Sequence, residues 1–281
     1  MPNLTKFRAA CVQMRSGIDR AQNTKDALSL IAEAAKDGAK FVATPEMTNV
    51  VDRNPRRMFE NIAAEDDMPE IAAFSAAAEA NKIWLLAGSF AVKVADKRAA
   101  NRAFLFGPDG RIVAKYDKLH MFDVDLPNGE SWKESAVYQP GPHPVLVDAD
   151  EAKIGLSICY DVRFPRLYRT LAQSGATILC VPAAFTKQTG EAHWKTLLTA
   201  RAIENGAFVI APAQGGKHED GRETYGHSLI IDPWGKVLAE APGDEPCVIS
   251  ADIDLDRAFE ARQRIPNLSL EQTFDVNIVK P

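Results

Sequence analysis

Residues 153–167, KIGLSICYDVRFPRL, predict a half-buried strand that runs through a polar turn into a helix. Ile154, Leu156 and Ile158 alternate with small or polar residues, which is typical of such a strand. Cys159 follows at its carboxyl end, where α/β proteins bind ligands and where the next helix offers unpaired backbone N–H groups. A thiol there can act as a nucleophile if a base and a cation lie near it; otherwise it is a small, buried apolar side chain.

Composition predicts one domain over residues 1–281. No linker rich in Pro, Gly or Ser divides the chain, and 46% of its residues are hydrophobic, which is enough for a large core. The net charge of −5, without a basic block, argues against nucleic acid or an anionic membrane as a partner. The first residues run into a strand pattern without an apolar signal region, and no stretch is long enough to span a bilayer. We therefore expect a cytoplasmic protein.

The four cysteines predict a reduced compartment rather than a disulfide framework or a zinc site. Cys11, Cys159, Cys180 and Cys247 are far apart and form no C-x-x-C pair. Cys11, Cys180 and Cys247 lie in apolar, strand-like runs, so we expect them in the core. Cys159 is then the one candidate for chemistry.

Glu46 occupies the same kind of position as Cys159. Residues 7–14 and 39–44 read as strands and residues 23–36 as the helix between them, a β-α-β unit with parallel strands. Glu46 follows the second strand directly. The alternative for this glutamate is a solvated loop charge.

A hairpin and a long loop follow. Residues 101–106 and 111–116 flank the turn Gly-Pro-Asp-Gly, so part of the sheet is antiparallel. The loop 118–141 starts with Lys118, contains Glu134 and is too aromatic for disorder, so we expect a wall or lid over a site. Lys118 can equally be an exposed lysine, and His120 is more typical of a structural hydrogen-bonding residue than of a catalyst.

The second half repeats the order of the first. Crossover units lead to a hairpin of residues 226–231 and 236–240, and a strand (247–253) and a helix (254–264) follow. Two facing sheets with helices outside would accommodate this order.

Three stretches together resemble the carbon-nitrogen hydrolase (nitrilase) superfamily. They are FVATPEM around Glu46, YDKLHMFDVDLP around Lys118 and IGLSICYDVRFPRL around Cys159, in the family's order. The resemblance covers nearly the whole chain, except for a poorly matched tail from about residue 267. It implies an α/β fold, a four-layer α-β-β-α sandwich of two mixed sheets with helices outside, and a homodimer or larger assembly.

The resemblance also implies a mechanism without a metal or another cofactor. Glu46 is the general base for the nucleophile Cys159, which forms a thioester acyl-enzyme. Lys118 and the backbone N–H of Tyr160 stabilise the oxyanion, and Glu134 holds Lys118. Amide hydrolysis needs a strong nucleophile, an oxyanion site and a proton for the leaving nitrogen, which these residue types supply. We also expect the Lys118 cation to favour the thiolate of Cys159.

Further stretches resemble the Nit branch, among them CYDVRFPRL, AHWKTLLTARAIEN and YGHSLIIDPWG. That branch contains omega-amidases, which hydrolyse 2-oxoglutaramate, and amidases that act on deaminated glutathione. The segment AQGGKHEDGRETYGHS resembles the second group more closely. The expected partner is therefore a small-molecule amide that carries a carboxylate.

Arg163 is the candidate for that carboxylate, because a guanidinium can bind it by two parallel hydrogen bonds. A salt bridge to Asp161 is the alternative. We expect Phe185, Thr186 and His193 to line the same pocket.

Other classes fit less well. A dinucleotide-binding enzyme would need a G-x-G-x-x-G after the first strand, and none is present. A metal-dependent amidohydrolase would need clustered ligands, whereas the five histidines are scattered. A noncatalytic scaffold of this superfamily should have lost at least one of the four catalytic positions, and all four are present.

Overall fold

The computed structural model describes residues 5–127, 129–149 and 152–280. Both ends of the single domain expected over residues 1–281 therefore lie outside the described residues. Among the described helices, none is long and apolar enough to cross a membrane.

The first half of the chain forms a sheet with the strand order β16-β1-β2-β3-β4-β5. β1, β2 and β3 are parallel, as the expected crossover requires, whereas β16 and the hairpin strands β4 and β5 pair antiparallel with their neighbours. The bounds are β1 (Lys6–Gln13), β2 (Ala39–Ala43), β3 (Trp84–Ala95), β4 (Arg98–Phe106), β5 (Ile112–Asp117) and β16 (Cys247–Asp254).

The second sheet has the order β15-β14-β11-β10-β9-β8. β9, β10 and β11 are parallel, whereas β8, β14 and β15 pair antiparallel with their neighbours, so both sheets are mixed. The bounds are β8 (Val145–Ala149), β9 (Ala152–Leu156), β10 (Ile178–Cys180), β11 (Phe208–Ala211), β14 (Leu229–Ile231) and β15 (Val237–Glu240).

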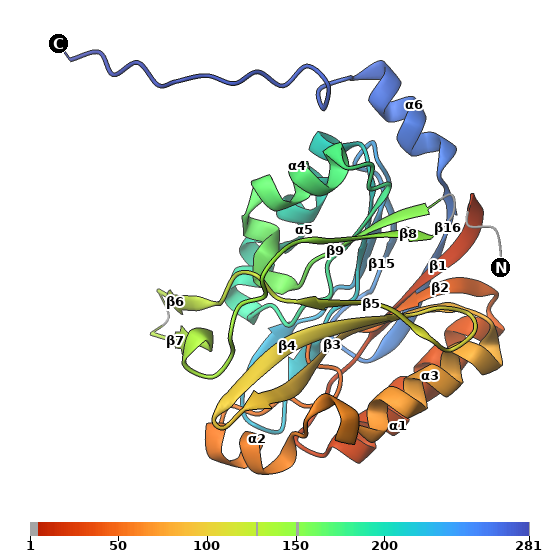
Figure 1. The fold of residues 1–281 in the computed structure, drawn as a ribbon, viewed down its shortest axis with the longest axis vertical. Coiled ribbons are helices and arrows are strands. Elements are labelled where there is room, and N and C mark those ends of the chain that lie inside the picture. The colour runs from red at the N-terminus through yellow and green to blue at the C-terminus, as the bar shows by residue number, and fades with distance from the viewer. Residues whose placement is uncertain (1–4, 128, 150–151, 281) are drawn as a thin grey trace.

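Helices cover the outer face of each sheet, which confirms the expected four-layer α-β-β-α sandwich (Figure 1). α1 (Arg20–Lys36) and α3 (Pro69–Asn81) pack on the first sheet, and α4 (Pro165–Gln173) and α5 (Lys187–Asn205) pack on the second. The shorter elements are α2 (Pro55–Asn61), η1 (Glu65–Asp67), β6 (Asp123–Asp125), β7 (Ser131–Lys133), η2 (Glu134–Ala136), β12 (Gly215–Lys217) and β13 (Glu223–Tyr225).

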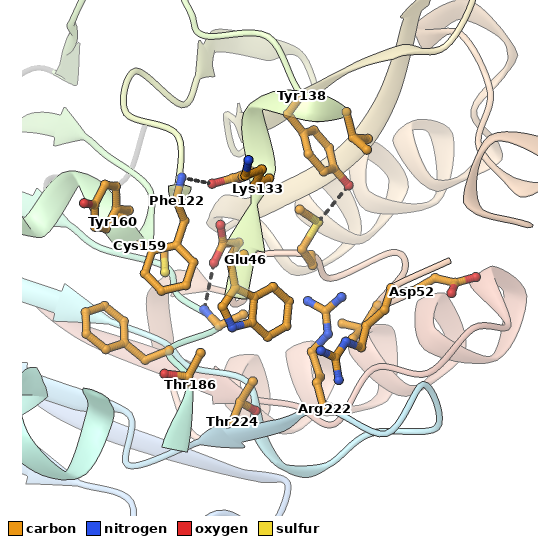
Figure 2. A pocket seen from close by; sticks show the side chains of 18 of the residues that line it. Glu46, Asp52, Phe122, Lys133, Tyr138, Cys159, Tyr160, Thr186, Arg222 and Thr224 are labelled. Carbon is orange, nitrogen blue, oxygen red and sulfur yellow. Dashed lines mark hydrogen bonds between the residues drawn. The ribbon is translucent and has the colours of Figure 1, made fainter. Parts of the chain in front are cut away.

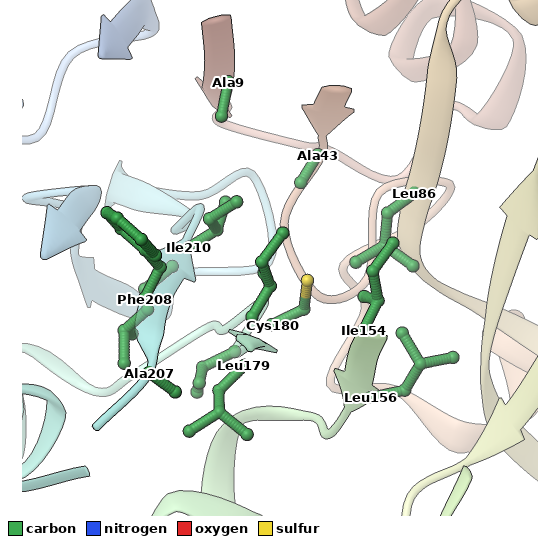
Figure 3. Packing of buried hydrophobic residues seen from close by; sticks show 14 of the residues in the cluster. Ala9, Ala43, Leu86, Ile154, Leu156, Leu179, Cys180, Ala207, Phe208 and Ile210 are labelled. Carbon is green, nitrogen blue, oxygen red and sulfur yellow. The ribbon is translucent and has the colours of Figure 1, made fainter. Parts of the chain in front are cut away.

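The main core lies between the two sheets. Figure 3 shows Ala9, Ala43 and Leu86 of the first sheet on one side, and Ile154 and Cys180 of the second sheet on the other. All five are completely buried, and burial of this apolar surface favours the face-to-face arrangement of the sheets.

The three cysteines expected in the core differ in burial. Cys11 and Cys180 are completely buried, which confirms the expectation for them. Cys247 is only partly buried, because it starts the edge strand β16, which has a single neighbour in its sheet.

The strand before Cys159 is buried on both faces rather than half-buried. Ile154 and Leu156 of β9 contribute to the core between the sheets. Gly155 lies on the face of β9 that packs against α4. A Cβ atom there would lie 3.1 Å from the Leu171 side chain, so glycine lets α4 pack closely on β9. A 3₁₀ turn, η3 (Cys159–Arg163), then connects β9 to α4.

The chain ends in α6 (Asp256–Arg264) and a tail. The tail extends away from the sandwich in Figure 1. Leu270, Phe274 and Ile278 are largely exposed there, so the tail contributes little to the core.

Candidate active site

A cavity of about 350 Å³ lies at the carboxyl ends of β2 and β9. Glu46, Lys118, Glu134 and Cys159 all line it, so the fold brings the four expected catalytic side chains together. Figure 2 shows Glu46 and Cys159 next to one another in this cavity. The volume falls in the range typical of small-molecule sites.

The backbone presents Cys159 on a strained turn. Its φ of +49° lies in the left-handed region, which side chains other than glycine rarely adopt. Its backbone N–H donates to the carbonyl of Pro182 at 2.9 Å, which ties the turn to the neighbouring loop. The residue keeps 8% of its surface exposed and lines the cavity. The turn therefore directs the sulfur into the cavity rather than into the core.

Asp161 stabilises this turn through hydrogen bonds. Its fully buried carboxylate accepts hydrogen bonds from the backbone N–H of Ile158 at 2.9 Å and from that of His120 at 3.1 Å. The hydroxyl of Tyr116 donates to it at 2.6 Å. Because Ile158 directly precedes Cys159, these bonds fix the conformation of the turn η3, which carries the expected nucleophile and which we call the nucleophile turn.

Glu46 has both carboxylate oxygens occupied and is only 3% exposed. Oε1 accepts from Lys118 Nζ and from Asn101 Nδ2, each at 2.8 Å. Oε2 accepts from the backbone N–H of Ala184 at 2.8 Å. A carboxylate with three donors around it has a single orientation in the cavity.

Lys118 lies between two carboxylates. Its ammonium is 2.8 Å from Glu46 Oε1 and 3.0 and 2.9 Å from the two oxygens of Glu134. Glu134 is itself held by the backbone N–H of Phe122 at 2.7 Å and by Asn101 Nδ2 at 3.2 Å. Lys118 is 2% exposed, so it is not the surface lysine that was the alternative.

These contacts determine the charges of Glu46 and Lys118. Burial alone would raise the pKa of Glu46, but the charge of Lys118 and hydrogen bonds from Lys118, Cys159 and Asn101 outweigh it and lower the pKa. Burial alone would lower the pKa of Lys118, but the charges of Glu134 and Glu46 raise it well above its ordinary value. At neutral pH the site therefore contains an ionised carboxylate beside an ammonium ion.

The pKa of the Cys159 thiol is raised well above its ordinary value. Burial is the largest cause, and the negative charge of Glu46 adds to it. Lys118 acts in the expected direction and lowers the pKa, but its effect is smaller than that of burial and Glu46 together. The resting cysteine is therefore a protonated thiol beside a carboxylate, because Lys118 favours the thiolate as expected but does not outweigh burial and Glu46.

Tyr160, Arg163, Phe185 and Thr186 all line the cavity, where the sequence placed them. His193 does not, and its expected place in the pocket is wrong. It lies on the exposed side of α5, and its Nδ1 is 3.3 Å from the Arg163 guanidinium.

The expected alternative for Arg163, a salt bridge to Asp161, is absent. Asp161 is occupied by the donors described above and by His120 Nδ1 at 2.7 Å. Among the residues that the structure describes, no carboxylate lies within 4.0 Å of the Arg163 guanidinium. The guanidinium instead lies over the Phe185 ring, 5.3 Å from its centroid.

Sequence reasoning did not single out Asn101, Arg53 or Arg222 as residues of the site. Asn101 donates to both Glu46 and Glu134, and an Asn inside the largely buried strand β4 was the available signal. Trp132, from the aromatic loop 118–141 that we expected to form a wall of the site, lines the cavity together with Arg53 and Arg222. They come from three separate segments, and nothing in the spacing of the sequence indicated that they meet.

The described residues contain no group of three or more His, Cys, Asp or Glu side chains arranged to hold a metal ion.

The comparisons with known proteins agree with this geometry. The sequence profile of the family described as carbon-nitrogen hydrolase matches residues 8–263. Deaminated glutathione amidase from Synechocystis sp. (strain PCC 6803 / GT-S) is 42% identical over an alignment of 266 positions, which covers 93% of this chain and 97% of that protein. Omega-amidase NIT2 from Homo sapiens is 36% identical over an alignment of 282 positions, which covers 99% of this chain and 100% of that protein.

Among solved structures, the C. elegans NitFhit protein superposes with a TM-score of 0.88 at 34% identity. The match covers 95% of this chain and 65% of that one, so this chain spans just under two thirds of NitFhit.

Proposed function

Because this chain belongs to the carbon-nitrogen hydrolase family, we propose that it is an amidase that hydrolyses deaminated glutathione to 2-oxoglutarate and cysteinylglycine. The observation that carries the proposal is the meeting of Glu46, Lys118, Glu134 and Cys159 in one cavity. The similarity to deaminated glutathione amidase over 93% of the chain supports the choice of substrate.

In the proposed reaction, Glu46 takes the thiol proton as the sulfur of Cys159 attacks the amide carbon. Lys118 and the backbone N–H of Tyr160 stabilise the negative oxygen of the tetrahedral intermediate. Glu46 then gives the proton to the leaving nitrogen, and the C–N bond breaks to leave a thioester. Glu46 finally activates the water that hydrolyses the thioester. The hydrogen bonds from Lys118, Asn101 and Ala184 support this role, because they orient the Glu46 carboxylate.

Arg163 is the proposed ligand of the 2-oxo-carboxylate on the acyl half of the substrate. The absence of a carboxylate partner among the described residues and the position of the guanidinium over Phe185 in the cavity support this role. An omega-amidase that acts on 2-oxoglutaramate needs the same acyl site, and it is the second candidate because of the similarity to human omega-amidase NIT2.

We also propose a cytoplasmic location, a single catalytic domain and a homodimer or larger assembly. The tail with its exposed Phe274 and Ile278 supports the assembly, because subunit contact would cover these side chains. Light scattering on the active protein tests the assembly, and a strictly monomeric active enzyme would contradict it.

The test of the function is the comparison of kcat/KM for deaminated glutathione, 2-oxoglutaramate, a simple nitrile and an N-carbamoyl amino acid. We expect the highest value for deaminated glutathione. Cys159→Ala, with an unchanged circular dichroism spectrum, should remove turnover entirely. Amidase activity retained in this variant would rule out the mechanism, and a preference for 2-oxoglutaramate would favour the second candidate.

A further inference from the structure

Two arginines lie against one tryptophan in a part of the cavity that the proposed mechanism does not use. The guanidinium carbons of Arg53 and Arg222 are 4.8 and 5.1 Å from the centroid of the Trp132 ring. Arg53 comes from the loop before α2, Arg222 from the loop before β13 and Trp132 from β7. We call Arg53 and Arg222 the distal arginine pair.

The positive charge of the distal arginine pair is incompletely neutralised within the described part of the chain. No described carboxylate lies within 4.0 Å of the Arg53 guanidinium. Arg222 is held through Nε by Asp220 at 2.9 Å, which orients its guanidinium. Asp52 also lines the cavity, but Arg57 already binds both its oxygens at 2.6 and 2.8 Å.

Three further carboxylates lie in this region. Glu223 is 3.7 Å from the Lys187 ammonium. Glu130 and Glu191 line the adjoining hollow that the distal arginine pair shares, and Glu130 accepts a hydrogen bond from Trp132 Nε1 at 3.3 Å. Two guanidinium groups on one ring repel each other unless an anion lies between or beside them. A ligand with a carboxylate would supply that charge, and guanidinium binds carboxylate through paired hydrogen bonds.

The position of the pair indicates which half of a substrate it would meet. In Figure 2, the Glu46 carboxylate lies between Cys159 and Arg222. In an amide bound for attack by Cys159, the nitrogen that receives the proton from Glu46 is on the Glu46 side of the sulfur. The leaving group therefore extends towards Arg222, whereas Arg163 lies against Phe185 beside the nucleophile turn.

We propose that Arg53 and Arg222 form a subsite for a carboxylate on the leaving group of the substrate, with Trp132 as its floor. This inference rests on the proposed function and deepens it. Deaminated glutathione has such a carboxylate at the end of its cysteinylglycine half, and 2-oxoglutaramate, which releases ammonia, has none. The distal arginine pair is then a specificity determinant that favours the larger substrate over the smaller one.

The experiment compares three substrates with the full-length enzyme. They are deaminated glutathione, the same compound with its glycine carboxylate converted to a primary amide, and 2-oxoglutaramate. In the wild type, amidation should lower kcat/KM about tenfold or more, through KM, because a charge-assisted hydrogen bond is lost. Arg53→Gln and Arg222→Gln should each lower kcat/KM for the free carboxylate by about tenfold and change it less than about twofold for 2-oxoglutaramate and for the amidated compound.

Arg56→Gln is the matched control. It removes one arginine charge from the same region, but its side chain is 89% exposed and lies outside the cavity lining. Arg222→Gln leaves the buried Asp220 without its cation and can destabilise the fold, whereas Arg53 has no described ion pair to lose. Arg53→Gln therefore keeps the test valid if Arg222→Gln fails to fold.

The outcomes separate this inference from the proposed function. A wild type that hydrolyses deaminated glutathione but does not distinguish it from its amidated form overturns the subsite and leaves the function standing. Equal losses on all three substrates in Arg53→Gln also overturn it, because they indicate a structural role. A wild type active on 2-oxoglutaramate and inactive on deaminated glutathione overturns both.

Discussion

Lys118 Nζ lies 2.8 Å from Oε1 of Glu46, and neither side chain exposes more than 5% of its surface. In such surroundings each charge depends on the other, because water cannot replace a lost partner. The same ammonium also binds both oxygens of Glu134. Lys118 therefore keeps Glu46 ionised and also holds this proposed base beside the sulfur of Cys159.

Replacement of Lys118 by Met should lower kcat about 10²–10³-fold or more, because the oxyanion loses its cationic donor. The pKa of Glu46 should also rise, since burial remains while the cation that lowers the pKa is gone. Steady-state kinetics measure the change in kcat. The pH dependence of thermal unfolding reports the change in the pKa of Glu46. Lys153→Met is the control, because that lysine is partly exposed and pairs with Asp148 at 3.1 Å. Turnover within about tenfold of the wild type would exclude the oxyanion role.

Replacement of Glu46 by Gln should lower the pKa of the Cys159 thiol and, at the same time, lower turnover. After burial, the charge of Glu46 is the largest cause of the raised pKa of Cys159, so its removal should lower this pKa while Lys118 stays in place. Thiolate should then form at lower pH than in the wild type. Turnover should nevertheless fall about 10²–10⁴-fold, because Gln cannot accept the proton.

The thiolate absorbance and the rate of alkylation by iodoacetamide against pH report this shift, with Glu46→Gln/Cys159→Ala as the background. An unchanged or higher pH for thiolate formation in Glu46→Gln would contradict the electrostatic account of the resting thiol.

The sequence was sufficient to predict two facing sheets with helices outside, and to predict that Glu46 and Cys159 each follow the carboxyl end of a strand. Crossover units place Glu46 and Cys159 each at the carboxyl end of a parallel strand, but β2 and β9 belong to different sheets, so only the resemblance to the family predicted that the two residues meet. The resemblance to the family, rather than periodicity, added Lys118 and Glu134. Their burial depends on Asn101 and on the backbone of Phe122, which no local pattern reports.

The errors have a common physical origin in side-chain direction. His193 was placed in the pocket by its position in a motif, but it faces solvent on α5. Arg163 and Asp161 are close in sequence, yet the 3₁₀ turn directs Asp161 towards Ile158 and Arg163 towards the cavity. The distal arginine pair depends on loop packing, which hydrophobic periodicity does not encode.

Asp161→Asn should loosen the nucleophile turn. The carboxylate accepts from Ile158 and His120 backbone N–H groups and from Tyr116, and an amide would turn its NH₂ towards one of these donors. We expect a loss of about 1–3 kcal/mol in the free energy of unfolding, because one buried donor stays unpaired. We also expect a lower kcat.

Tyr116→Phe is the matched variant for Asp161→Asn, because it removes one of these bonds without adding a donor and should cost less in both measurements. Chemical denaturation and steady-state kinetics give the two values. If Asp161→Asn retained wild-type stability and kcat, the turn would not depend on this carboxylate.

Arg163→Lys tests the acyl end of the substrate. A lysine keeps the charge but offers no planar fork, so the two parallel hydrogen bonds to a 2-oxo-carboxylate cannot both form. KM for 2-oxoglutaramate should rise about tenfold while kcat changes little, because the bond lies away from the reacting carbon. His193→Ala, which removes the exposed neighbour of Arg163 from outside the cavity, is the control and should change KM less than about twofold. An unchanged KM in Arg163→Lys would assign the carboxylate to another residue. An equal rise of KM in both variants would mean that His193 positions the guanidinium and that the two parallel hydrogen bonds of Arg163 do not determine KM.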